Sequence, residues 1–185
     1  MKGKIHIIFL GFIVLMQKFY AQDSTSIVLT NTSIDTSLVV VNKKDSLKNS
    51  KKVDEIISFA KTFMGTPYRY AGSTPSGFDC SGFVSYVMGN FGFSLVHSSY
   101  GMAEFGETVR LNDIRPGDLM FFKGSNVNSS RIGHVALVVE VKDNVIRFIH
   151  SSNGKGVGID TFNGSRYYVP RFVKAKRLDY GIKSK

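Results

Sequence analysis

The sequence predicts an α+β fold in which helices come first and an antiparallel sheet follows. In the first half of the chain, apolar residues recur at helical spacing over residues 53–64 and 80–88. In the second half, short apolar segments alternate with polar residues and are separated by turn formers, which is typical of strands joined by hairpins. The chain has 185 residues, of which 43% are hydrophobic and 12% aromatic, so one compact domain with flanking segments is expected.

The first 21 residues have the pattern of a secretory signal. Lys2 and Lys4 precede an apolar run over residues 5–16, and the small residue Ala21 follows it. The run is shorter than the ~20 residues that span a bilayer, so a signal is favoured over a membrane anchor. We therefore expect residues 1–21 to be a signal peptide and the mature protein to be exported, without stable membrane insertion.

Residues 22–52 have the composition of a solvated tether. Ten of these 31 residues are Ser or Thr, and the segment has no aromatic residue, glycine or proline. We predict a disordered Ser/Thr/Lys-rich linker, with a short strand over residues 38–41 as the alternative. The net charge is +10, or 10 − 3 = +7 without Lys2, Lys4 and Lys18 of the signal. A basic exported protein suits anionic polymers of the envelope, whereas the export signal argues against nucleic acid as a partner.

A folded domain is expected over residues 53–178, followed by a basic tail over residues 179–185. Gly65 provides the C-terminal stop for the first helix of this domain. The loop after that helix contains Tyr68, twelve residues before Cys80. Its hydroxyl is therefore a candidate to reach the sulfur.

Cys80 is the only cysteine of the chain and lies in the segment Gly77-Phe-Asp-Cys-Ser-Gly-Phe83. Loop formers precede it and an apolar helical pattern follows it, so Cys80 is predicted in the first turn of a helix. Free backbone N–H groups and the positive end of the helix dipole stabilise a thiolate there. Gly77 and Gly82 allow another backbone to approach closely. The alternative is that Cys80 is a small buried apolar residue.

Two histidines are predicted to meet at one end of a hairpin. His134 opens a strand over residues 134–140, and His150 closes a strand over residues 145–150. Asp143-Asn144 is a turn signal between them, so the strands are expected to pair antiparallel. A catalytic thiol needs a nearby base, and that base needs a third group that orients it. The pair is therefore a candidate for both roles.

The remaining segments carry weaker signals. His97 either lines a cleft or is an exposed histidine beside a helix cap at Ser98 or Ser99. Residues 163–168 are expected to form a loop, and residues 168–173 a strand.

Five separated segments together resemble the NlpC/P60 family of cell-wall peptidases. They are Pro67-Tyr68, Gly77-Phe-Asp-Cys-Ser-Gly-Phe83, Pro116-Gly-Asp-Leu-Met-Phe-Phe122, Gly133-His-Val135 and His150. The resemblance covers roughly residues 53–178 and is specific, because the segments agree in order and in spacing. The sequence departs from it at Ala71, where many members have glycine, and at His97, where arginine is common. Both departures concern substrate detail rather than the reaction.

The resemblance implies a papain-like fold, in which the helix that carries the nucleophile packs on an antiparallel sheet. It implies a secreted, cell-wall-associated cysteine endopeptidase that cleaves peptidoglycan stem peptides, between γ-linked D-glutamate and the following diamino acid. By position, Cys80 corresponds to the nucleophile, His134 to the general base and His150 to the third member. Tyr68 corresponds to an oxyanion-stabilising tyrosine. Asp79 and Ser81 correspond to residues that hold the free amino end of the stem peptide.

Other functions remain as alternatives. Cys80, His134 and His150 are types of residue that bind zinc, which would make the protein a zinc-dependent hydrolase. A catalytically silent wall-binding module would keep the fold without the reaction, and an acyltransferase would use the same thiol and histidine. For the peptidase we expect no cofactor and no metal. The sequence leaves the oligomeric state and the preferred diamino acid open.

Overall fold

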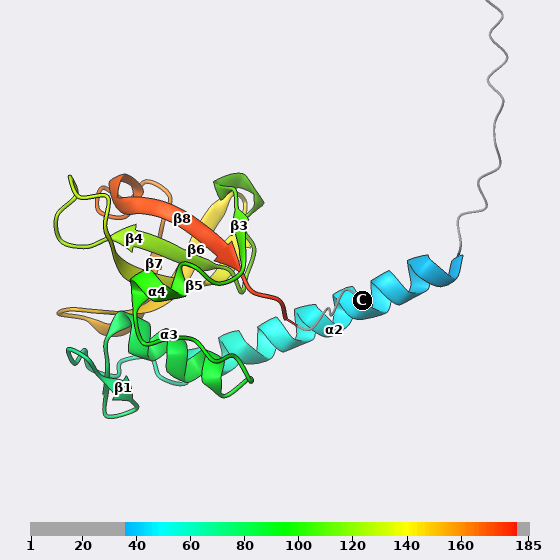
Figure 1. The fold of residues 1–185 in the computed structure, drawn as a ribbon, viewed down its shortest axis with the longest axis horizontal. Helices are drawn as coiled ribbons and strands as arrows, with labels where there is room; N and C mark the ends of the chain where they lie inside the picture. Colours follow the sequence, from blue (N-terminus) through cyan, green and yellow to red (C-terminus); the bar gives the residue numbers. More distant parts are fainter. Residues whose placement is uncertain (1–35, 181–185) are drawn as a thin grey trace, which may run out of the picture. The chain divides into compact units, whose positions relative to one another are not determined.

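The computed structural model describes residues 36–180, with side chains from residue 47 onward (Figure 1). The helices are α2 (Thr36–Lys61), α3 (Cys80–Gly89) and α4 (Ser99–Met102). The strands are β1 (Ser73–Thr74), β2 (Gly77–Phe78), β3 (Glu107–Val109), β4 (Leu119–Lys123), β5 (Ile132–Lys142), β6 (Val145–Ser152), β7 (Gly156–Thr161) and β8 (Phe172–Arg177). Short 3₁₀ turns lie at Leu111–Asp113 and Val169–Arg171. The predicted signal peptide lies outside the described residues.

Six strands form one sheet in the order β3-β8-β4-β5-β6-β7, and every pairing is antiparallel. This confirms the predicted α+β fold. The predicted hairpin is β5 and β6, joined by Asp143 and Asn144 with φ of 50° and 60°. Two successive residues with positive φ match the right-handed twist of the strands on either side.

The sheet has an apolar core on each face, because side chains alternate along its strands. In β4, Leu119 and Phe121 face one core, and Met120 and Phe122 face the other. The first core also contains the buried residues of α3 and of the C-terminal part of α2, which lie together on one side of the sheet in Figure 1. The helices are thus fixed to the sheet by apolar burial.

The predicted linker differs from the structure where the two overlap. Residues 36–52 belong to α2, so this part is helical, and the alternative strand over residues 38–41 is wrong. The segment has no glycine or proline to stop a helix. It continues directly into the helical face of Ile56 and Ala60, which are fully buried. Residues 22–35 lie outside the described residues. Over the described part of the chain, no helix has both the length and the apolar character needed to cross a membrane.

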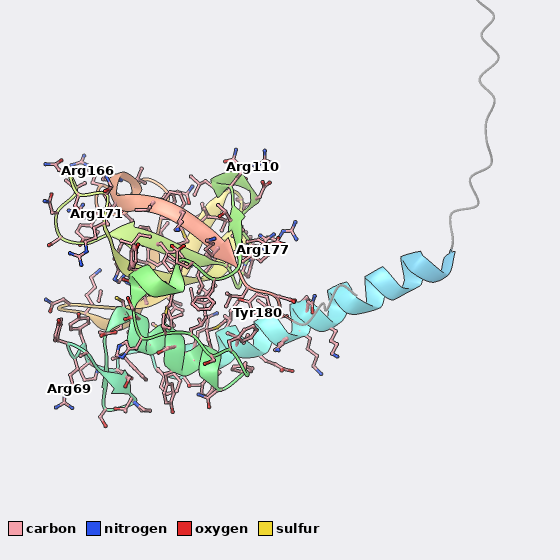
Figure 2. The ribbon with its side chains drawn as sticks, viewed as in Figure 1. Arg69, Arg110, Arg166, Arg171, Arg177 and Tyr180 are labelled. Carbon is pink, nitrogen blue, oxygen red and sulfur yellow. The ribbon has the colours of Figure 1, made fainter. Side chains whose placement is uncertain are left out.

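The last strand begins later than the sequence predicts. Pro170 falls within a 3₁₀ turn and has no N–H for a sheet ladder, so β8 runs over Phe172–Arg177 instead of residues 168–173. The guanidinium of Arg177 binds both carboxylate oxygens of the buried Asp118, each at 2.8 Å. The Tyr180 hydroxyl donates to the carbonyl of Gly117. Figure 2 shows Arg177 at the end of β8 and Tyr180 beyond it, toward α2.

Candidate active site

Cys80 is the first residue of α3, and its free thiol is partly exposed. The loop formers before it make a small hairpin, β1 with β2, that leads the chain into the helix. Asp79 is the N-cap residue, with an extended backbone and a carboxylate that accepts from the Gly82 N–H at 2.6 Å. A short polar residue in this place satisfies a helix N–H that has no partner within the helix. The predicted position of Cys80 in the first turn is confirmed.

The start of α3 is held against the loop that contains Tyr68. A methyl group on Gly82 would overlap the carbonyl of Gly72, and one on Gly77 would come within 2.8 Å of the Arg69 Cβ. The predicted close approach of another backbone is therefore confirmed at Gly82, whereas at Gly77 the nearest atom belongs to a side chain. Backbone pairing of Tyr68 with Phe78 fixes this loop one residue before the cap.

The thiol lies in an environment that opposes its ionisation. Burial raises the pKa of Cys80, and the charge of Asp79 adds to this effect. Backbone hydrogen bonding from Val135, and then from Ser81 and Cys80 itself, favours the thiolate but does not outweigh burial. The sequence predicts a lowered pKa from the helix N-terminus alone, and that prediction is wrong in sign, because burial at this position depends on tertiary packing.

His134 and His150 are direct neighbours, as the hairpin predicts. The Nε2 atom of His134 lies 2.7 Å from the Nδ1 atom of His150. Burial lowers the pKa of His134 to about 3, and His150 contributes in the same direction. His134 is therefore a neutral imidazole near neutral pH, which is the form that accepts a proton.

The sulfur lies against the start of β5, the strand that carries His134. Val135, whose backbone N–H acts on the sulfur, directly follows His134. In the described part of the chain no hydrogen bond joins the sulfur to either imidazole. Contacts of this kind are often long without substrate and tighten when it binds, so the arrangement is compatible with a thiol and its base.

Sequence reasoning missed two residues that continue the histidine pair. The Nε2 atom of His150 lies 3.1 Å from Oδ2 of Asp160, and Tyr168 donates its O–H to the same oxygen at 2.7 Å. Asp160 lies on β7, paired with Phe148 of β6. The segment Gly156–Thr161 alternates as a strand does, but its two glycines weaken the signal. The turn signal Asn153-Gly154 between the two strands could have indicated that this strand pairs with β6.

Tyr68 lies within electrostatic reach of the thiol. Burial raises the pKa of its hydroxyl, and the negative charges that Cys80 and Asp79 can carry raise it further. Tyr68 therefore stays protonated and keeps an O–H to donate. Ala71, where the resembling family often has glycine, has a φ of 55° in the same loop. That backbone region is unfavourable for alanine.

Asp79 and Ser81 lie together, but their polar atoms are already engaged within the protein. Ser81 donates its hydroxyl to Asp79 Oδ1 at 3.0 Å, and His97 Nε2 lies 2.9 Å from both carboxylate oxygens. His97 thus contacts the residue before the cysteine, and Ser98 rather than His97 caps α4. The predicted binding of a stem-peptide amine by Asp79 and Ser81 remains a prediction.

The zinc alternative has no support in the geometry of the described residues. A ring nitrogen of His134 and one of His150 face each other at hydrogen-bond distance, so neither is directed at a shared ion. Between residues 36 and 180, no group of three or more His, Cys, Asp or Glu side chains is placed to hold a metal. The two histidines interact with each other instead.

Known proteins resemble the chain over most of its described length. The profile of the NlpC/P60 family matches residues 65–177, more than half of the chain. Gamma-DL-glutamyl hydrolase of Bacillus subtilis (strain 168) is 30% identical over 140 residues, which cover 75% of this chain and 33% of the relative. Murein DD-endopeptidase MepS/Murein LD-carboxypeptidase of Escherichia coli (strain K12) is 34% identical over 115 residues, 62% of this chain and 56% of the relative.

Solved structures agree with the sequence match. A crystal structure of an NlpC/P60 family protein from Bacillus cereus has a TM-score of 0.61 and 30% identity, covering 68% of this chain and 40% of that one. The chain spans a third to just over half of the length of these relatives. The papain-like arrangement of α3 on the sheet is thus shared with solved members. Profile, relatives and fold agree, and the chain belongs to the NlpC/P60 family.

Proposed function

We propose that the protein is an exported cysteine endopeptidase that hydrolyses peptidoglycan stem peptides. The observation that carries the proposal is the position of the only cysteine, at the start of α3 and against the β5 residue that follows His134. The names of the relatives, a γ-glutamyl hydrolase and a murein endopeptidase, support the substrate class. The N-terminal signal pattern supports action outside the cytoplasm.

The mechanism begins from a neutral thiol and a neutral imidazole. His134 accepts the Cys80 proton as the sulfur attacks the amide carbonyl, and it later gives that proton to the leaving amine. The Cys80 N–H and the Tyr68 hydroxyl donate to the oxyanion. Water then hydrolyses the acyl-enzyme, again with His134 as the base.

The bond we propose lies between the γ-carboxyl of D-glutamate and the next diamino acid. A free amine of the stem peptide would share Asp79 with His97, since a carboxylate oxygen accepts more than one hydrogen bond. The γ-glutamyl specificity named for the Bacillus subtilis relative supports this choice.

Digestion of purified peptidoglycan tests the proposal. Wild type should release stem-peptide fragments whose masses show cleavage after D-glutamate, and Cys80→Ala should release none. Ser85→Ala, a matched change in the same helix, should behave as wild type. Fragment release by Cys80→Ala at the wild-type rate would contradict the thiol mechanism. Cleavage only at cross-links would contradict the proposed bond, and binding by wild type without any release would indicate a silent wall-binding module.

A further inference from the structure

A line of hydrogen bonds runs from His134 through the interior of the protein. His134 contacts His150, which is only 1% exposed, and His150 contacts Asp160. Tyr168 donates to the Asp160 oxygen that faces His150. Lys155 lies 3.4 Å from the other oxygen and is exposed. The line therefore runs from the proposed base to a carboxylate on the second-last residue of β7.

The charge of Asp160 decides which atoms carry protons along this line. Hydrogen bonding from His150 holds the pKa of Asp160 well below its ordinary value, despite the opposing effect of burial. An ionised carboxylate only accepts, so the facing Nε2 of His150 must carry a hydrogen. Burial and the bond to Asp160 raise the pKa of Tyr168, so its O–H also remains a donor.

The hydrogen on Nε2 of His150 in turn determines which nitrogen of His134 carries a hydrogen. In the neutral form of His150 the one hydrogen is on Nε2, so Nδ1 has a lone pair and accepts from Nε2–H of His134. That leaves the lone pair of neutral His134 on Nδ1. One carboxylate thus determines the tautomer of two rings in succession.

We propose that Asp160, held by Tyr168, is a positioning residue that fixes both imidazoles so that Nδ1 of His134 is free to take the Cys80 proton. When the sulfur attacks, its proton moves to Nδ1, and His134 becomes an imidazolium whose Nε2–H still donates to His150. The Nδ1 proton then passes to the leaving amine. No proton reaches Asp160, whose negative charge stabilises the imidazolium through His150. The kinetic consequence rests on the proposed function, but the tautomers do not.

Nitrogen NMR of the imidazoles tests the inference without any substrate. The chain has four histidines, so signals can be assigned by substitution. In wild type at neutral pH, His134 and His150 should both be Nε2–H tautomers. Asp160→Asn should mix the tautomers of both rings and lower kcat about 10- to 100-fold with KM unchanged.

Two further variants separate positioning from folding. Tyr168→Phe keeps the ring but removes one donor to Asp160, so the same changes should appear in weaker form. Lys155→Met removes only the exposed ion pair on the other oxygen, so tautomers and kcat should stay as in wild type. An Nδ1–H tautomer of His150 in wild type would overturn the inference, whatever the variants do. A folded Asp160→Asn protein with the same tautomers and the same kcat as wild type would also overturn the inference. If the tautomers change while wild type cleaves no peptidoglycan, the proposed function fails and the inference stands.

Discussion

Burial determines the charge state of the two side chains proposed to react. It raises the pKa of the Cys80 thiol and lowers that of His134 to about 3, so both are neutral at rest. A preformed thiolate–imidazolium pair, which the position at a helix N-terminus favours in isolation, is disfavoured here. The residue types and their order were predictable from the sequence, because each chemistry requires particular side chains. Their ionisation was not, since burial follows from contacts between distant segments.

This charge state predicts the pH dependence of the thiol. Alkylation by iodoacetamide requires the thiolate, so its rate should rise with pH through a midpoint above about 8.5, the value of free cysteine. Because His134 is neutral above pH 3, its titration should add no inflection near the ordinary histidine pKa. The only cysteine makes mass spectrometry of the labelled protein a direct measurement, with a small thiol as control. Rapid labelling that stays constant down to about pH 5 would show an ion pair and contradict the prediction.

At the scale of elements, the helix that carries Cys80 and the β5–β6 hairpin follow from local patterns. Helical spacing after Cys80 and the Asp143-Asn144 turn were sufficient for both predictions. The signal for β7 is weak, since glycine interrupts it, although Asn153-Gly154 before it is the turn signal of a hairpin with β6. Asp160 was not linked to His150, because the two glycines obscured β7, although the turn between the two strands is visible in the sequence.

Because α3 contacts the Tyr68 loop at one end only, glycine-to-alanine substitution should have different effects on stability at the two ends of the helix. Gly82→Ala should destabilise the protein by about 2 kcal/mol, because the methyl group overlaps the Gly72 carbonyl. It should also reduce activity by moving Tyr68. Gly89 lies at the other end of α3, and a methyl group added there would have no atom within 4 Å. Gly89→Ala should therefore leave the stability of the protein unchanged or raise it by up to about 1 kcal/mol. Urea unfolding measures both. Equal stability of the two variants would show that the loop does not rest on the helix as described.

At the scale of the whole molecule, an ion pair near the C-terminal end of the described chain joins the end of β8 to the residue before β4. Asp118 is 1% exposed and precedes β4, and Arg177 reaches it from the end of β8. The Pro116-Gly-Asp118 motif could be recognised in the sequence, but its partner could not, because 59 residues separate the two side chains. The extension of α2 to Thr36 was likewise missed, since composition without glycine or proline suits a helix as well as a tether.

Removal of this ion pair should destabilise the whole fold. Arg177→Met keeps the apolar stem but leaves the Asp118 carboxylate buried without its cation, which typically costs about 3 kcal/mol or more. Arg110→Met is a matched control, because Arg110 pairs with Asp113 on the surface, and it should leave the unfolding midpoint unchanged. Chemical denaturation followed by circular dichroism compares the two. A midpoint of Arg177→Met equal to wild type would mean that Asp118 is satisfied without its partner.

The adjacency of Asp79 and Cys80 has a consequence for protein engineering. One carboxylate caps α3, accepts from Ser81 and His97, and adds its charge to the field around the sulfur. A library randomised at this codon would therefore be selected for thermostability and for turnover at the same time. Directed evolution toward new substrates should leave Asp79 unchanged. Substitutions should accumulate at His97 instead, because they change a neighbour of the Asp79 carboxylate and leave Asp79 as the cap of α3.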